Sequence, residues 1–136
     1  MASLPTKLLK DVYWSFAEPV PLSPEALVAV VREYAVELEL PDGSSTLRQP
    51  LPFADVRIRY VHGNRTEGGE WCEVTQALRV VAPPANLLTG ADLLWELHVA
   101  CHSTVGADDR HCFEGFERVS PPGGGGAAEY EVILGS

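Results

Sequence analysis

The sequence is short of positive charge and of long apolar runs, and each shortage excludes a class of protein. Lysine and arginine total 10 against 19 for aspartate and glutamate, which gives a formal net charge of −9. A field of that sign repels phosphate backbones, so we expect no nucleic-acid ligand. No apolar run approaches the roughly eighteen residues that a membrane helix needs, so we expect no membrane-spanning segment either.

Cysteine usage and the N-terminal segment bear on the cellular compartment. The three cysteines, Cys72, Cys101 and Cys112, form no CxxC pair, so neither a disulfide framework nor a zinc knuckle is predicted. We expect reduced, largely buried thiols. The N-terminal stretch "MASLPTKLLKDVYW" lacks an apolar run followed by a small-residue cleavage site. We therefore expect no signal peptide and a cytoplasmic protein.

What the chain does have is the composition of a globular domain. Apolar residues make up 46% and charged residues 21%, close to the averages for soluble globular proteins. A chain of 136 residues fits one domain and buries close to about 70% of the surface that its unfolded form would expose. We predict a single α+β domain over residues 1–136 with a substantial hydrophobic core.

Two segments carry the start signals of helices. Ser23 is placed as an N-cap before Pro24 at the first helical position, and apolar residues follow at helical spacing. Thr89 and Asp92 form a capping box at the start of the second predicted helix. The end of the first helix is ambiguous, because residues 36–49 fit either a helix end followed by a loop or an additional hairpin.

Five segments are predicted to be strands, most of them because apolar and polar residues alternate with the period of a half-buried strand. They are residues 11–19, 55–63, 71–82, 111–120 and 128–134. The second and third of them are separated by a polar turn and predict a β-hairpin. In its first strand we expect Val56, Ile58 and Tyr60 to point inward. Arg57 and Arg59 then point outward.

The order of the predicted elements is strand, helix, strand, strand, helix, strand, strand. The first six match the βαββαβ order of ferredoxin-like folds, with an extra C-terminal strand. We expect a two-layer sandwich in which an antiparallel sheet carries both helices on one face. The opposite face is then charged with both signs and is open to solvent or to a docked partner. Its residues are Arg57, Arg59, Glu73, Thr75, Arg79, Glu129 and Glu131.

A cluster of histidine, cysteine and aspartate residues lies in and after the second predicted helix. His98 and His102 are one helical turn apart, a spacing at which two imidazoles can chelate one metal ion. Further ligands would come from the next segment, which holds Asp108, Asp109, His111 and Cys112. The residues between the two histidines include no glutamate, so the HExxH motif is absent. The favoured interpretation is that the histidines fill a helix border by hydrogen bonding.

These observations predict a non-enzymatic protein-interaction module of the inhibitor, immunity or adaptor type. The basis is the negative charge, the absence of a catalytic motif, and turn-rich loops. We expect a protein partner, a basic one being favoured by the charge, and no cofactor; homo-oligomerisation stays open. Binding would use an acidic surface or the open sheet face, with Arg57, Arg59, Glu73, Arg79, Glu129 and Glu131. The alternative is an enzyme or ligand-binding protein with a divalent transition metal such as zinc on His98, His102, His111 and Asp108.

Overall fold

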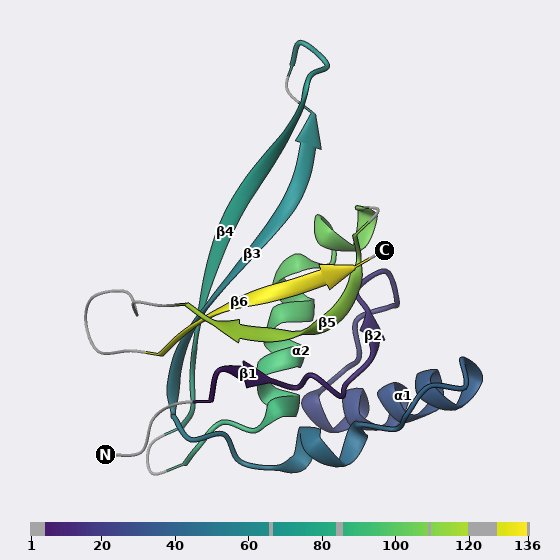
Figure 1. The fold of residues 1–136 in the computed structure, drawn as a ribbon, viewed down its shortest axis with the longest axis vertical. Coiled ribbons are helices and arrows are strands. Elements are labelled where there is room, and N and C mark those ends of the chain that lie inside the picture. Colours follow the sequence, from purple (N-terminus) through teal and green to yellow (C-terminus); the bar gives the residue numbers. More distant parts are fainter. Residues whose placement is uncertain (1–4, 66, 84–85, 109, 120–127, 136) are drawn as a thin grey trace.

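The protein is an α+β structure in which a six-stranded mixed sheet and two α-helices form two layers (Figure 1). The computed structural model describes residues 5–65, 67–83, 86–108, 110–119 and 128–135. The strands are β1 Lys7–Leu8, β2 Trp14–Ser15, β3 Asp55–Arg65, β4 Trp71–Val81, β5 Cys112–Arg118 and β6 Ala128–Gly135. The helices are α1 Pro24–Glu37 and α2 Gly90–Cys101, with short 3-10 helices η1 Ser44–Arg48 and η2 Val105–Ala107. Helix α2 lies behind β5 and β6 in Figure 1, and α1 packs against α2.

The strand order differs from the ferredoxin-like arrangement that the element order predicts. The order is β1-β5-β6-β3-β4, with β2 also paired to β5. Strand β6 runs parallel to β3, so the sheet is mixed and not antiparallel. In a ferredoxin-like sheet the first predicted strand would lie between the fourth strand and the hairpin, and here β6 takes that place. Residues 11–19 supply only the two-residue β2 at the other side of β5.

The inward and outward faces of the strands are as the alternation predicts. Val56 and Ile58 are fully buried, Tyr60 is buried, Arg57 is exposed and Arg59 is partly exposed. Strand β6 likewise turns its alternate apolar residues into the core between the sheet and the helices. The face to which a side chain points depends only on the local alternation, so it is predicted correctly for β3 and β6 even though the neighbouring strand is not.

Both predicted helix starts are confirmed. The Ser23 hydroxyl accepts a hydrogen bond from the Ala26 N–H at 3.1 Å, and Thr89 and Asp92 make the reciprocal bonds of a capping box. The ambiguous segment 36–49 resolves as the end of α1 followed by η1, without a hairpin. Within the described part of the chain, every helix is too short or too polar to cross a membrane.

The hairpin of β3 and β4, here called the arm, extends well beyond the body of the molecule (Figure 1). On β3, the inward residues stay buried as far as His62. On β4, Val80 is the one buried residue among eleven. Because β4 ends the strand order, its outer edge pairs with no other strand in the described residues. The arm therefore presents one face of the sheet and one free strand edge.

Candidate functional site

The six residues predicted to bind a partner lie on the outward face of the sheet, on the side opposite the helices. Five of them fall in two adjacent rows across β6, β3 and β4, and Glu73 lies further along the arm. In the first row Arg57 lies between Glu129 and Arg79, and in the second Arg59 lies beside Glu131. Glu129 and Arg59 are partly covered and the other four are exposed. The strand register thus gathers residues that are far apart in the sequence.

Several charges on this face are paired, Arg59 with Glu129 and Glu131 and Arg79 with Asp55. Arg59 Nε lies 3.4 Å from a Glu129 carboxylate oxygen and an Arg59 terminal nitrogen lies 4.0 Å from Glu131. Arg79 donates two hydrogen bonds to Asp55, which lower the pKa of that carboxyl group. Exposed pairs of this kind contribute little to stability because water screens them. They can exchange partners when another charged surface approaches.

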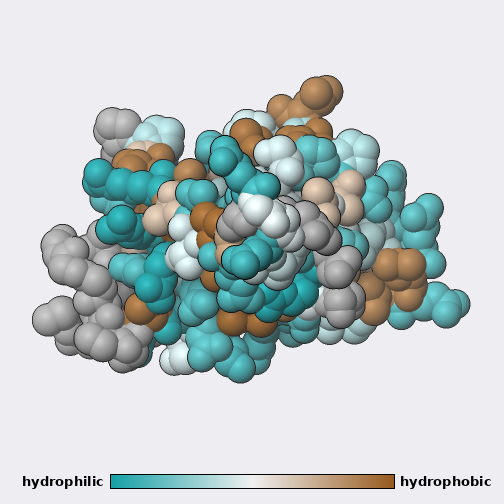
Figure 2. Space-filling model, turned by 90° about the horizontal axis from the view of Figure 1, so that it is seen from above, coloured by the Kyte–Doolittle hydropathy of each residue, from teal (hydrophilic) through white to brown (hydrophobic). Residues whose placement is uncertain are grey.

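Exposed apolar side chains lie on the same face at the two ends of β4. Trp71 is 60% exposed near the end of the arm, and Val81 is 57% exposed at its base. The Trp71 ring lies against Gly63, where a β-carbon would overlap the indole. Viewed along the arm, apolar residues form separate patches among hydrophilic ones, without one continuous apolar area (Figure 2).

His98 is a fully buried structural residue. Trp14 Nε1–H donates to His98 Nδ1 at 3.1 Å, and His98 Nε2–H donates to the backbone oxygen of Glu18 at 3.0 Å. The indole nitrogen can only donate and the carbonyl can only accept, so the ring is the neutral tautomer with its hydrogen on Nε2. Burial lowers the pKa of His98, which favours the same neutral form. Both ring nitrogens are therefore engaged.

The other two histidines of the cluster hold the same N-terminal segment, residues 14–18. His102 Nδ1–H donates to the backbone oxygen of Phe16 at 3.0 Å. His111 Nδ1 and the Ser15 hydroxyl form a hydrogen bond of 2.8 Å. Together with His98, these contacts hold the segment in place, and its first three residues, Trp14, Ser15 and Phe16, are buried although only two of them form a strand. We call the three histidines the histidine clasp.

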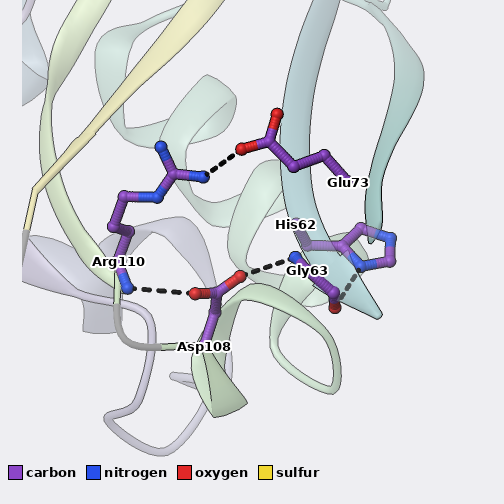
Figure 3. Close-up of polar contacts among 5 residues, drawn as sticks. All are labelled: His62, Gly63, Glu73, Asp108 and Arg110. Atoms are coloured by element: carbon purple, nitrogen blue, oxygen red, sulfur yellow. Dashed lines mark hydrogen bonds and ion pairs between the residues drawn. The ribbon is translucent and has the colours of Figure 1, made fainter. Parts of the chain in front are cut away.

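Asp108, the fourth predicted metal ligand, fastens the arm to the body (Figure 3). Its carboxylate accepts the Gly63 N–H of β3 at 2.6 Å and the Arg110 N–H at 3.2 Å. The Arg110 guanidinium donates to Glu73 of β4 at 3.0 Å. The segment before β5 therefore holds both strands of the arm. His62, which precedes Gly63 on β3, is buried, and its Nδ1 forms a hydrogen bond of 3.2 Å with the Gly63 carbonyl oxygen.

The predicted metal ligands are divided between two structural roles. His98 and His102 lie side by side, with ring centroids 5.4 Å apart, but His111 faces Ser15 and Asp108 faces the arm. No group of three or more metal-binding side chains is brought together among the described residues, and Asp109 lies outside them. The positions of these side chains give the metal hypothesis no support.

Cys101 and Cys112 are placed as poor nucleophiles. Burial raises the pKa of the Cys101 thiol to about 12. Burial, followed by the charge of Glu114, also raises the pKa of Cys112. A nucleophilic cysteine needs its thiolate form near neutral pH, which these surroundings disfavour.

An open groove of about 940 Å³ lies between α1 and η1. Its wall carries Arg32, Asp42 and Arg48, so charges of both signs line it. Hydrogen bonds from Ser44 lower the pKa of Asp42, and Arg32 lies 4.0 Å from the same carboxylate. An ionised carboxylate held in a local turn is a weak candidate for a general base, which works best with a pKa near neutrality.

His102→Gln should leave thermal stability nearly unchanged, within about 1 kcal/mol, because a glutamine amide can still donate to the Phe16 carbonyl. The measurement is the Tm of tag-free wild type and variant, each with chelator and with added zinc. We expect no zinc-dependent rise in either protein. A rise in the wild type that His102→Gln abolishes would instead identify His102 as a ligand, because even outer-shell changes cost a metal site at least about tenfold in affinity.

Comparisons with protein-family models, with curated proteins and with solved structures found no match to this chain. The case for function therefore rests on the geometry of the sheet. Sequence reasoning located the outward face but omitted Trp71 and Val81, which belong to the same alternation as Glu73 and Arg79. Their position in that alternation was the available signal, since a large apolar residue in an outward register is a candidate contact.

Proposed function

We propose that this protein is a non-enzymatic protein-interaction module of the inhibitor, immunity or adaptor type, acting in the cytoplasm. The partner binds the outward face of the sheet, over Arg57, Arg59, Glu129 and Glu131. The observation that supports this is the one-sided layering: α2 lies behind the sheet with α1 packed against α2, and no described element covers the outward face (Figure 1). A flat surface with paired charges offers many directional contacts to a protein and no enclosed site for a small substrate.

The charge of the chain indicates the chemistry of the partner. With a net charge of −9, the long-range field attracts a basic surface and accelerates encounter at low ionic strength. Salt should weaken the association mainly through a slower association rate, because exposed charges are screened beyond about 8 Å at physiological ionic strength. The paired arginines and glutamates of the face then determine the orientation.

The test is a charge reversal that leaves the net charge unchanged. Arg57→Glu combined with Glu131→Lys inverts two exposed charges of the outward face. The matched control, Arg32→Glu combined with Glu33→Lys, inverts two exposed charges on α1. Affinity purification from the native host should recover a stoichiometric partner with the wild type. We expect the outward-face variant to bind it at least about tenfold more weakly, because opposed like charges are costly at an interface.

The control variant should retain nearly full affinity. Equal weakening by both variants would show that the outward face has no special role in binding. Recovery of the free protein alone, at near-native abundance, would count against an interaction module altogether.

A further inference from the structure

Strand β4 has a sequence pattern that reads similarly in both directions. Its eleven residues, WCEVTQALRVV, are centred on Gln76. Moving outward from Gln76, the strand has a small residue or threonine, then an aliphatic residue, then a charged residue, on both sides. The two charges have opposite sign, Glu73 on one side and Arg79 on the other. A strand with this pattern is complementary to a second copy of itself in the antiparallel direction.

We propose that the free edge of β4 pairs with β4 of a second copy of this chain, about a two-fold axis through Gln76. The edge is accessible, since Thr75, Gln76 and Ala77 at the middle of the strand are all exposed. Unpaired edge strands are ready templates for another strand, and monomeric proteins commonly shorten or protect them. Here an edge of eleven residues is carried on an arm that extends from the body (Figure 1).

The outward face is charge-complementary in this register. Glu73 of each copy lies opposite Arg79 of the other, so two interchain pairs form by symmetry. Their side chains are 62% and 69% exposed and retain free bonding capacity. Arg79 already pairs with Asp55, and Glu73 already pairs with Arg110. The pairs between the two copies therefore link these ion pairs into two networks in which negative and positive side chains alternate. Arg57 lies directly across from Arg79 on β3. Its positive charge also attracts the Glu73 carboxylate that the second copy brings next to Arg79.

Apolar residues also meet in this register. Trp71 of one copy lies opposite Val81 of the other, and these are the two large apolar residues of β4 that are more than half exposed. On the inward face, Val74 lies opposite Leu78, and both are partly exposed in the single chain. Pairing therefore covers apolar surface on both faces of the strand. Removing this surface from water contributes favourable free energy to the dimer.

The dimer is independent of the proposed partner site. It uses the edge of β4 with Glu73 and Arg79, whereas the proposed partner site is centred on Arg57, Arg59, Glu129 and Glu131 of β3 and β6. Loss of one therefore does not entail loss of the other. A dimer of this kind would extend the outward face across two chains with the helices of both copies on the same side.

Charge exchange between the two copies tests the register. The wild type should sediment as a dimer at micromolar concentrations. Glu73→Arg alone and Arg79→Glu alone should each dissociate at least about tenfold more readily, because each homodimer then has two like-charged pairs. An equimolar mixture of the two variants should restore the dimer, since both pairs are again of opposite sign in the heterodimer. Circular dichroism verifies folding of each variant.

A disulfide at the axis provides a second measurement. Residues directly opposite in an antiparallel pair have Cα atoms about 4.5 or 5.5 Å apart, within the span of about 4.4 to 6.8 Å that a disulfide allows. Gln76→Cys in a Cys72→Ser background should form a 76–76 disulfide dimer under mild oxidation. Thr75→Cys in the same background is the control, because two copies of residue 75 lie out of register with each other.

A wild type that stays monomeric at about 100 micromolar would overturn the proposal. A dimer whose dissociation is unchanged by the charge substitutions would overturn this β4 register. Failure of the two variants to form a dimer when mixed would overturn it as well. Equal crosslinking at residues 75 and 76 would do the same.

Discussion

His98→Ala should lower the free energy of unfolding by about 3 to 5 kcal/mol. The change removes a fully buried ring and leaves the Trp14 N–H and the Glu18 carbonyl without their partner. A buried polar group that loses its hydrogen bond costs about 1 to 3 kcal/mol, and the cavity adds to that cost. Urea unfolding followed by tryptophan fluorescence measures the difference. His102→Ala, which removes one hydrogen bond from a partly exposed ring, should cost much less. Equal losses at both positions would contradict the burial assigned to His98.

The same residue should make stability depend on pH. Burial holds the pKa of His98 below its ordinary value of about 6.5. Its contribution is therefore fully present above pH 6.5 and is lost as the pH falls toward the lowered pKa, because the unfolded chain then binds the extra proton. We expect the wild type to lose stability between about pH 7.5 and pH 5 more steeply than His98→Ala. Parallel pH profiles would contradict a neutral buried ring.

Ile58→Ala should cost about 2 to 4 kcal/mol, whereas Arg57→Ala should stay within about 0.5 kcal/mol. The two residues are neighbours on β3, but Ile58 is fully buried and Arg57 is exposed. Removing Ile58 atoms leaves a cavity against the layer of helices, and removing the Arg57 side chain leaves only solvent. Chemical denaturation of both variants measures the contrast. Comparable losses would mean that the register of β3 is wrong.

The elements that could be predicted from the sequence are those set by neighbouring residues. Both helices are capped by hydrogen bonds between residues three positions apart, made by Ser23 in one case and by Thr89 and Asp92 in the other. The alternation of β3 determines which side chains are buried, because successive residues point to opposite faces. Strand order has no such local signal. Nothing within residues 128–134 distinguishes pairing beside β3 from pairing at the far edge of the sheet, so the parallel β3–β6 pair was not foreseen.

In the candidate site, too, the features set by neighbouring residues could be predicted and those set by distant segments could not. Hydrogen bonding by His98 and His102 was the favoured interpretation of their helical spacing, and both do make such bonds. Their acceptors are the carbonyls of Glu18 and Phe16, which lie 80 and 86 residues away in the sequence. Full burial of His98 follows from that distant segment and not from the helix itself. Alternation alone was sufficient to place the charged residues on the outward face, because successive side chains of a strand point to opposite faces whatever its neighbouring strand is.

The histidine clasp has a consequence for the order of events during synthesis. Its contacts join residues 14–18 to residues that lie 80 to 96 positions later in the chain. The N-terminal segment, with Trp14 and Phe16, therefore leaves the ribosome long before its partners exist. Until α2 and the following segment emerge, these aromatic side chains lack the histidines that hold them and most of the core that buries them. Closing so large a loop is entropically costly and slow. The nascent chain thus exposes apolar residues that must wait for partners 80 to 96 positions later, a period in which chaperones have a defined target.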